Sequence, residues 1–495
     1  MTKVPGIGKV LIANRGEIAV RVARTLRRLE ITCAALTHPD DTGNPAAAFV
    51  DEACPVEGES AISAYLDIDQ IVSIAKRIGA DAVHPGYGFL AENADFAEAV
   101  ERAGIRWVGP APETIRLMGD KIESRRFAAA HGIPVTPAAS EEDDPASFSE
   151  RAKEIGFPLL IKAAAGGGGK GMQIVRHPHE LSHAIDLARS EAKRYFDDDR
   201  IFAERYLDEP RHVEVQIMAD EHGHVVHLGE RDCSIQRRFQ KLIEESPAPA
   251  IEEDLRERIR AQAVLLARAA GYRNAGTVEF IVAPDGESCF LEMNTRLQVE
   301  HPVTEMVTGI DLVEEQIRVA AGHPLSSGQD EIRFEGAAIE CRICAEDPER
   351  DFQPAVGRIL LLRPAKGPGI RFDGGIAEGQ DVTAAFDPML AKLIVHGRDR
   401  EEAIVLARQA LAQTVILGCT TNLAFLERVL AHPDFISGRV ETGFIPAHRT
   451  DLALPPLAEE ERAALLSVAA LTDRDFMASV EAVPEPYASM GDWQN

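Results

Sequence analysis

TVEFIVAPDGESCFLEMN, residues 277–294, has the pattern of two β-strands joined by a tight turn. Its two halves are rich in apolar residues, and Asp285-Gly286 between them is a favoured hairpin turn. With the turn at this dipeptide, Glu279 lies directly opposite Glu292, and Asn294 shares their face. Opposed like charges destabilise a sheet unless a cation binds them. The hairpin therefore predicts a Mg²⁺ site at Glu279, Glu292 and Asn294, the alternative being an incidental acidic pair on an exposed face.

The run that follows is polar: TRLQVEHP, residues 295–302. Pro302 favours an extended chain before it, which puts Arg296, Gln298 and Glu300 on one side. A guanidinium, an amide and a carboxylate beside a metal are suited to hold a small planar oxyanion with a base next to it. An ordinary polar surface loop is the alternative interpretation.

KAAAGGGGKGM, residues 162–172, contains four consecutive glycines between two lysines. Such a run costs backbone entropy, and proteins tolerate it where bare N–H groups approach a ligand such as a phosphate. It is not a Walker A loop, because glycine follows Lys170 where that motif needs serine or threonine. Strands are expected on both sides of it, so we predict a flexible lid over nucleotide phosphates; the alternative is a plain linker.

Two further motifs are less decisive. ERDCSIQRRFQK, residues 230–241, gathers four cations in an acidic chain, which predicts either a phosphate-facing wall or a solvated basic strand. Cys341 and Cys344 form a CxxC pattern, but strand alternation puts their sulfur atoms on opposite faces. We therefore expect neither a redox pair nor a zinc site there.

The first 115 or so residues alternate strands and helices, the pattern of a doubly wound parallel sheet. A proline- and acid-rich stretch at 134–145 suggests a hinge into a second unit. We expect an α/β protein with domains at 1–118, 119–330 (with a lid at about 135–205) and 331–449, the last of α+β type. A tail or linker at 450–495 follows.

Composition excludes some classes of function. The chain has 53 basic and 80 acidic side chains, a net charge of -27, so it repels nucleic acid, and anionic substrates need a local basic pocket. No apolar stretch is long enough to span a membrane, and the first residues do not resemble a secretory signal. Seven scattered cysteines indicate a reducing compartment, so we expect a cytoplasmic protein.

Several motifs taken together resemble the biotin carboxylase family of ATP-grasp enzymes. The resemblance runs from about residue 9 to 449. It rests on IANRGEIA (12–19), HPGYGFLAEN (84–93), MGDK (118–121), KAAAGGGGKGM (162–172), PRHVEVQ (210–216), ERDCSIQRR (230–238), EMNTRLQVEHPVTE (292–305) and ECRICAEDP (340–348). It implies a ligase that makes carboxyphosphate from ATP and bicarbonate and passes the carboxyl group to biotin.

The resemblance also implies roles for residues in matching motifs. Glu300 would be the base that deprotonates bicarbonate, which Arg296, Gln298, the Val299 backbone and Lys241 would hold. Glu279, Glu292 and Asn294 would bind Mg²⁺ or Mn²⁺. Arg342 would stabilise the biotin enolate, with Tyr87 near the ureido ring. The implied ATP contacts are Lys121, Lys162, Gly166, Gly167, Gly168, Gly169, Lys170, Gly171, Met172, Glu204, Leu207, His212 and Gln236.

The chain also departs from the family pattern. The family usually has histidine where this chain has Phe239, so one donor is missing near the reacting groups; Lys170 and Arg205 are milder exchanges of one cation for another. No lysine lies in a biotin-carrier signature, so biotin is expected on a separate carrier domain or protein, or on a longer form of this chain. A carboxyltransferase subunit and a homodimer are the other expected partners. The final carboxyl acceptor stays open.

Two other functions remain possible at this stage. One is a different ATP-grasp ligase that joins a phosphorylated carboxylate to an amine. The other is a nucleotide-binding subunit that has lost turnover, for which Phe239 is the support.

Overall fold

The computed structural model describes residues 4–165, 172–455 and 458–471. Residues up to Leu452 form one compact unit, and a second unit begins at Ala453. The described part of the second unit contains one helix, α17 (Glu459–Leu471). Among the described helices, none has both the length and the apolar character needed to cross a bilayer. The predicted glycine-loop contacts Gly166, Gly167, Gly168, Gly169, Lys170 and Gly171 lie outside the described residues.

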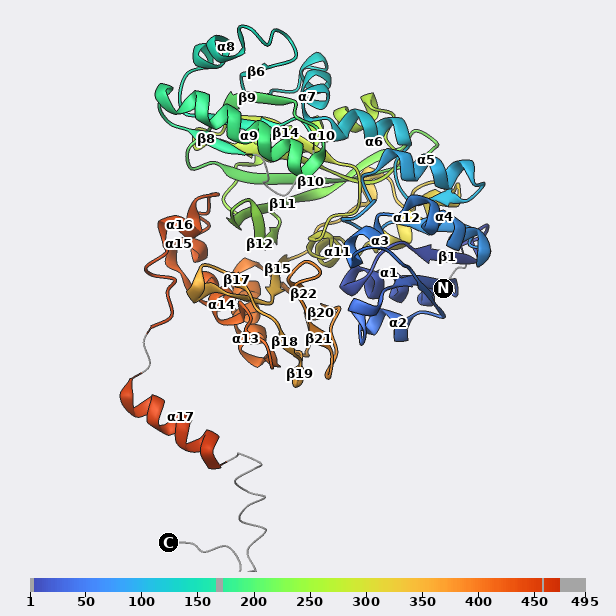
Figure 1. Cartoon of the computed structure of the whole chain (residues 1–495), viewed down its shortest axis with the longest axis vertical. Coiled ribbons are helices and arrows are strands. Elements are labelled where there is room, and N and C mark those ends of the chain that lie inside the picture. The colour runs from blue at the N-terminus through green and yellow to red at the C-terminus, as the bar shows by residue number, and fades with distance from the viewer. Residues whose placement is uncertain (1–3, 166–171, 456–457, 472–495) are drawn as a thin grey trace, which may run out of the picture. The chain divides into compact units, whose positions relative to one another are not determined.

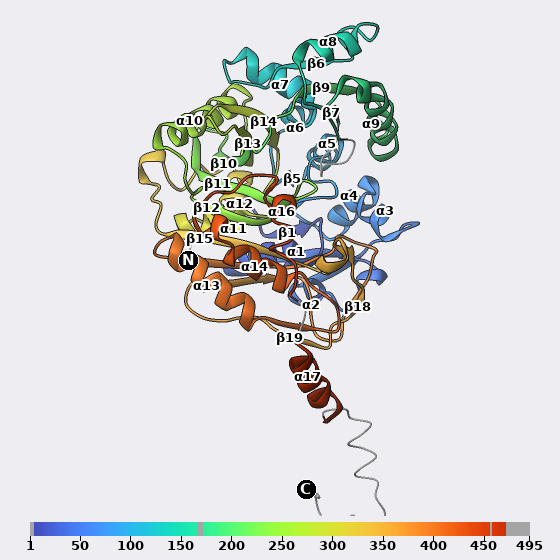
Figure 2. The same cartoon turned by 90° about the vertical axis from the view of Figure 1, so that its left-hand side faces the viewer.

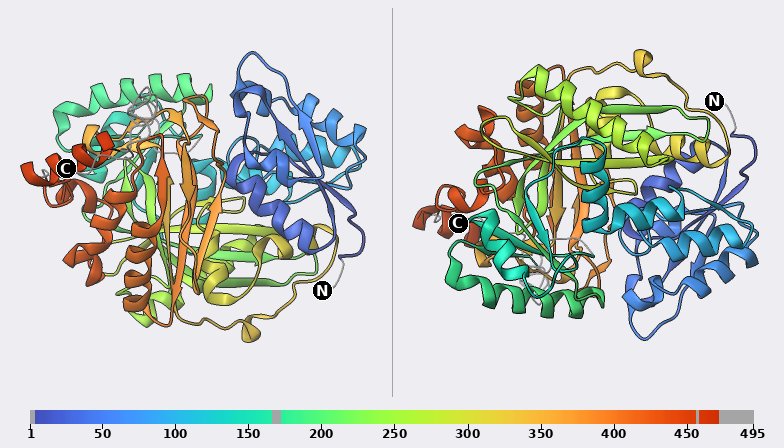
Figure 3. Two further views of the ribbon diagram at one scale, coloured as in Figure 1. Left: turned by 90° about the horizontal axis from the view of Figure 1, so that it is seen from below. Right: turned by 90° about the horizontal axis from the view of Figure 1, so that it is seen from above.

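A five-stranded parallel sheet forms the N-terminal region, with the order β3-β2-β1-β4-β5. Alternate side chains of β1 enter different apolar cores: Val10 and Ile12 one, Leu11 the other. Helices therefore cover both faces of the sheet, as Figure 3 shows for the blue region. The elements are β1 (Lys9–Ile12), α1 (Gly16–Arg28), β2 (Thr32–Thr37), η1 (Pro39–Asp41), α2 (Pro45–Phe49), β3 (Glu52–Pro55), α3 (Ala61–Tyr65), α4 (Ile68–Arg77), β4 (Ala82–His84), α5 (Ala94–Arg102) and β5 (Arg106–Trp107).

A small antiparallel sheet with its own core follows, in the order β6-β9-β7-β8. Helices α6 (Pro112–Gly119) and α7 (Lys121–Ala130) lead into it, and the side chain of Asp120 caps the start of α7. In Figure 1 this sheet lies at the top, beside α8 and α9. Its elements are β6 (Ala138–Ser140), α8 (Phe148–Ile155), β7 (Leu159–Ala163), β8 (Gln173–Val175), η2 (Pro178–Glu180), α9 (Leu181–Phe196) and β9 (Ile201–Arg205). The glycine run connects β7 to β8, strand to strand as predicted.

The largest sheet has eight antiparallel strands in the order β14-β13-β10-β11-β12-β15-β22-β20. The strands of its first half, from the β14 edge to β12, are β10 (Arg211–Ala219), β11 (Val225–Arg237), β12 (Gln240–Ser246), β13 (Asn274–Val282) and β14 (Ser288–Asn294). The helices of this part are α10 (Glu253–Ala269), α11 (His301–Thr308) and α12 (Leu312–Ala320), with the short turn η3 (Gln329–Glu331). Helix α10 packs on β10 and β11 over an apolar core.

The sheet continues past residue 330. Strand β15 (Ala337–Cys344) pairs with β12, and β22 (Met389–Gly397) and β20 (Ile370–Gly374) extend the sheet. Helices α13 (Arg400–Gln413) and α14 (Leu423–Ala431) cover this end (Figure 2). The remaining elements are β16 (Glu346–Asp347), η4 (Pro348–Arg350), β17 (Gln353–Pro354), β18 (Gly357–Arg358), β19 (Leu361–Arg363), β21 (Asp381–Val382), β23 (Val415–Leu417), α15 (Pro433–Ile436) and α16 (Phe444–Ala447). The division into domains at 118, 330 and 449 stays a prediction.

The β13–β14 hairpin has the predicted register at its open end, but not the predicted turn. Glu279 pairs with Glu292. The loop contains three residues, because the backbone of Ala283 exchanges its hydrogen bonds with Gly286 and Glu287. A bulge between Glu279 and Phe280 then shifts the register by one residue. The longer loop and the bulge cancel, which is why the carboxylates still face each other.

Candidate functional site

A cavity of about 670 Å³ opens between the N-terminal sheet, the small sheet and the large sheet. All the described residues that the sequence singled out for ligand binding line it, except Glu300. Glu300 has no solvent exposure and lies beneath Lys241 and Arg342. The lining residues are Tyr87, Lys121, Lys162, Met172, Glu204, Leu207, His212, Gln236, Lys241, Glu279, Glu292, Asn294, Arg296, Gln298, Val299 and Arg342.

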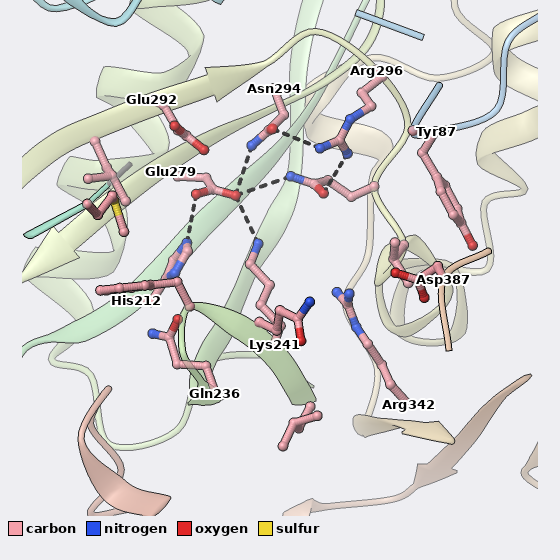
Figure 4. A pocket seen from close by; sticks show the side chains of 18 of the residues that line it. Tyr87, His212, Gln236, Lys241, Glu279, Glu292, Asn294, Arg296, Arg342 and Asp387 are labelled. Carbon is pink, nitrogen blue, oxygen red and sulfur yellow. Dashed lines mark hydrogen bonds and ion pairs between the residues drawn. The ribbon is translucent and has the colours of Figure 1, made fainter. Parts of the chain in front are cut away.

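Lys241 contacts three buried carboxylates, and Figure 4 shows its contact with Glu279. Its Nζ donates to Glu214 at 2.5 Å, Glu300 at 2.6 Å and Glu279 at 2.9 Å. Burial alone would lower the pKa of Lys241, but these three carboxylates raise it well above its usual value. Lys241 is therefore a permanent cation at physiological pH.

Glu300 lies between two cations. It accepts from Lys241 and from Arg342, whose Nη2 is 2.9 Å away. Burial would raise the pKa of Glu300, but Lys241, Arg342 and Arg231 outweigh it and hold that pKa below its usual range. The carboxylate is thus ionised and able to accept a proton, although the two cations make it a weak base in this arrangement.

The predicted metal ligands face one another across the hairpin. Glu279 accepts from Lys241, from Asn294 at 2.8 Å and from Gln298 at 3.2 Å, and Glu292 pairs with Lys121. Two carboxylates and a nearby amide form a donor set of hard oxygens that fits Mg²⁺. The amide oxygen of Asn294 accepts from Arg296 at 3.0 Å, so this oxygen has to turn before it can bind a metal.

Arg296 is held by several acceptors. Its Nε donates to Glu92 at 2.9 Å and its Nη1 to Gln298 at 2.8 Å. Buried Lys392 donates to the carbonyl of Val299 at 2.8 Å and lies 5.6 Å from the ring centroid of Tyr87. Arg296, Gln298 and the Val299 backbone therefore come together at the junction of the large sheet and the N-terminal region. The predicted extended chain before Pro302 is wrong, because residues 299–300 form a turn into α11, and Glu300 lies outside the cavity lining.

A second cluster lies at the small sheet. Glu204 pairs with Lys162 and with Arg125 at 2.8 Å, and it accepts from Thr136 at 2.8 Å. Burial alone would raise the pKa of Glu204, but Lys162 and Arg125 lower it to about 2. His212 Nε2 lies 3.0 Å from Glu279 and so connects this side of the cavity to the carboxylate pair.

The basic run at 230–241 is not a continuous phosphate-facing wall. Arg231 is fully buried against Glu214, Arg237 lies over the ring of Phe352 at 4.3 Å, and Arg238 pairs with Asp351. Of its four cations only Lys241 lines the cavity. Arg231 contacts the same carboxylate, Glu214, but it is buried among Gln216, Thr277 and Thr304. Cys341 and Cys344 are both buried free thiols on β15.

Comparison with known proteins accounts for most of the chain. Residues 6–115 match the family model described as biotin carboxylase, N-terminal domain, and residues 340–447 that of the biotin carboxylase C-terminal domain. Residues 120–328 match the ATP-binding domain of the carbamoyl-phosphate synthase L chain. Biotin carboxylase 1 of Bacillus subtilis is 46% identical, over 89% of this chain and 99% of that protein. The chain belongs to the biotin carboxylase family.

Other members of the biotin carboxylase family are longer proteins. The mitochondrial methylcrotonoyl-CoA carboxylase subunit alpha of Dictyostelium discoideum is 44% identical over 99% of this chain and 70% of that subunit. The rat subunit is 46% identical, over 90% of this chain and 63% of its own length. The chain thus spans about two thirds of these subunits.

Solved structures agree with the fold. The biotin carboxylase domain dimer of Hydrogenobacter thermophilus 2-oxoglutarate carboxylase, in complex with MgADP, ADP and bicarbonate, has a TM-score of 0.89 and 42% identity. The match covers 91% of this chain and 99% of the Hydrogenobacter chain. Campylobacter jejuni biotin carboxylase has a TM-score of 0.86 and 41% identity, over 89% of this chain and 99% of its own.

Sequence reasoning left several residues that contact the cavity lining of this family member unassigned. Glu214 contacts Lys241, Glu92 contacts Arg296, and Lys392 contacts the Val299 carbonyl. Glu214 could have been found, because it is two residues from His212 on one strand and therefore on the same face. Lys392 is 93 residues from Val299, and no local pattern marks that contact.

Proposed function

We propose that this chain carboxylates biotin with ATP and bicarbonate, as the first half-reaction of a biotin-dependent carboxylase. The observation that carries the proposal is the cluster of Lys241, Glu300 and Arg342 beside the opposed carboxylates Glu279 and Glu292 in one cavity. It combines a base, fixed cations and a metal-binding pair, the groups that phosphoryl transfer to bicarbonate requires.

In the first step Glu300 accepts the proton of bicarbonate, and the resulting oxygen nucleophile attacks the γ-phosphorus of ATP. The bond to ADP breaks, and carboxyphosphate and ADP are formed. Lys241, Arg296 and Gln298 hold the bicarbonate oxygens. Glu279 and Glu292, with Asn294, would hold Mg²⁺, which would supply positive charge for the transferred phosphoryl group.

Ligand binding is also proposed to change the pKa of the base, Glu300. In the ligand-free arrangement Lys241 contacts Glu300 directly, and Lys121 contacts Glu292. Anionic bicarbonate and phosphates compete for both lysines, while a metal replaces them on the carboxylates. As Lys241 moves its contacts to the anions, the pKa of Glu300 rises and it becomes a better base.

In the second step the carboxyl group of carboxyphosphate passes to a ring nitrogen of biotin. Its bond to the phosphate oxygen breaks, and inorganic phosphate leaves with the proton of that nitrogen. We propose that Arg342 stabilises the negative charge that develops on the ureido ring of biotin. Tyr87 is proposed to lie beside this ring and to position it. Lys121, Lys162, Glu204, Leu207, His212, Gln236, Met172 and the glycine run at 166–171 are proposed to bind ATP. The guanidinium of Arg342 is suited to stabilise the charge on biotin, because a fixed cation requires no reorganisation at the moment of reaction.

The assembly around this half-reaction is also proposed. Biotin is carried by a carrier domain or protein, and a carboxyltransferase subunit uses the product; the relatives named above are subunits or domains of such carboxylases. A homodimer is proposed from the dimer named for the Hydrogenobacter domain. We also propose domain boundaries at residues 118, 330 and 449 and a cytoplasmic location.

ADP release by the purified chain tests the function. Mg²⁺, bicarbonate and free biotin are omitted in turn, and Glu300→Gln is compared with the wild type. We expect hydrolysis to require bicarbonate, to rise with biotin and to fall at least about 100-fold in the variant, since a general base contributes roughly 10²–10⁴. Hydrolysis without biotin stimulation would favour another ATP-grasp ligase. Nucleotide binding without hydrolysis would favour a non-catalytic subunit.

A further inference from the structure

Two glutamates face each other below Arg342. Glu244 on β12 and Glu340 on β15 are directly opposed across the antiparallel pair, and neither has any solvent exposure. Glu340 is two residues from Arg342 on the same strand, so both side chains are on one face. Neither glutamate has a part in the chemistry described above.

The hydrogen bonds of this pair are unequal. Glu244 Oε1 accepts from Arg342 Nε at 2.5 Å, whereas its Oε2 has no hydrogen-bond partner among the described residues. Both carboxyl oxygens of Glu340 are buried and likewise without a partner there. The charged and titratable groups that face the pair come from five segments: Lys241 on β12, Arg342 on β15, Lys392 on β22, Cys233 on β11, and Glu300 before α11.

Two ionised carboxylates in this position would destabilise the folded state. Like charges directly opposite each other destabilise a sheet. A buried carboxylate without donors also loses its hydrogen bonds to water, and no protein hydrogen bond replaces them. Burial raises the pKa of Glu244 to about 7, although Arg342 opposes that shift. Burial raises the pKa of Glu340 well above its usual value, and Lys392 offsets this only in part. Glu340, whose two carboxyl oxygens have no donor among the described residues, is therefore the glutamate that keeps its proton.

We propose that Glu244 and Glu340 hold one proton between them, on Glu340, and that ionised Glu244 thereby fixes Arg342 for the reaction with biotin. Arg342 is bound at both ends, by Glu244 through Nε and by Glu300 through Nη2. The inference rests on the proposed function, because it assigns Glu244 as a positioning residue for that reaction. Glu340 acts through Glu244 as an uncharged neighbour.

This arrangement predicts a specific pH dependence. Below about pH 7 protonation of Glu244 releases one end of Arg342, so the biotin-stimulated rate declines as the pH falls. Ionisation of Glu340 at high pH would add a second negative charge and draw Arg342 away from Glu300. Because Arg342 also contacts Glu300, the bicarbonate-dependent rate without biotin is measured at each pH, and the predicted decline is that of the stimulation by biotin.

The test measures ADP release with and without free biotin, from pH 6 to 9, on the full chain. Glu340→Gln mimics the protonated acid, and we expect its biotin-stimulated kcat within about twofold of the wild type, with the same decline at acid pH. Glu244→Gln removes the anchor, and we expect a loss of roughly 10–100-fold, as for other supporting groups around a reactive centre, and no further acid decline. Glu245→Gln is the matched control, because Glu245 is buried on the same strand but pairs with Arg400.

Infrared difference spectra supply an independent readout. The wild type minus Glu340→Gln should show the carbonyl stretch of a buried protonated carboxyl group. Should Glu340→Gln fail to fold, Glu340→Met serves instead, because an uncharged side chain of similar volume preserves the proposed state. A Glu340→Gln rate far below wild type, a Glu244→Gln profile that keeps its acid decline, or no carboxyl band overturns the proposal. Absence of bicarbonate-dependent hydrolysis in the wild type would instead refute the proposed function, while the infrared result would still decide the protonation of the pair.

Discussion

Phe239 lies in the turn between β11 and β12 with a backbone φ of 66°, and its side chain is 42% exposed on the cavity wall. This left-handed conformation costs a residue with a Cβ about 1–2 kcal/mol, and histidine adopts it more readily than a bulky apolar residue. We expect Phe239→His to increase biotin-dependent ADP release by about tenfold, because a hydrogen bond to a charged group contributes ~1.5–3 kcal/mol. Steady-state assays with saturating Mg²⁺ and bicarbonate measure the change.

Phe239→Leu is the control for this substitution, since it removes the ring without adding a donor. It should leave the rate near that of the wild type. An equal increase in both variants would show that bulk, rather than the missing donor, limits turnover in this chain.

Among the secondary-structure elements, the β13–β14 hairpin contains the proposed metal ligands Glu279, Glu292 and Asn294. Glu292→Gln removes one of two opposed carboxylates and leaves Lys121 without its partner. We expect the Mg²⁺ concentration for half-maximal ADP release to rise at least about tenfold, because Mg²⁺ is bound by one or two carboxylates and the phosphates. Titration of Mg²⁺ at fixed ATP measures this. Glu287→Gln, at the exposed turn of the same hairpin, should not change the requirement, and an unaltered titration for Glu292→Gln would exclude it as a ligand.

The same hairpin shows what the sequence could and could not predict. Alternation along each strand placed Glu279, Glu292 and Asn294 on one face, because a period of two is a local property. The pairing of Glu279 with Glu292 was predicted from a two-residue turn, and it holds only because the longer loop and the bulge cancel. The three-residue loop and the bulge were not predicted, since they depend on how the strands pack on β10 and α10. The partners of Lys241 were predicted only in part: Glu279 and Glu300 belong to motifs, whereas Glu214 comes from β10 and is fixed by the sheet order.

In the compact unit as a whole, one buried charge cluster joins regions far apart in sequence. Arg21 of α1 donates to Glu305 of α11 at 2.6 Å, Arg371 of β20 donates to the other oxygen of Glu305 at 2.7 Å, and Arg371 also binds Asp373 at 2.6 Å. Burial would raise the pKa of Asp373, but Arg371, Lys392 and Arg21 lower it to about 2. Because this value lies below the usual one for aspartate, the pairing stabilises the fold above about pH 4, and that contribution is lost as the pH falls toward 2.

Asp373→Asn should therefore lower the free energy of unfolding by about 3 kcal/mol at pH 7, since breaking a buried pair leaves a cation uncompensated. The difference from the wild type should shrink when urea unfolding is repeated at pH 3. Asp95→Asn removes a carboxylate whose side chain is 78% exposed beside Arg116, and its effect should stay within about 0.5 kcal/mol at both pH values. A deficit for Asp373→Asn that is the same at pH 7 and pH 3 would mean that its cost comes from lost packing, and that the charges of this cluster do not hold the N-terminal and C-terminal regions together.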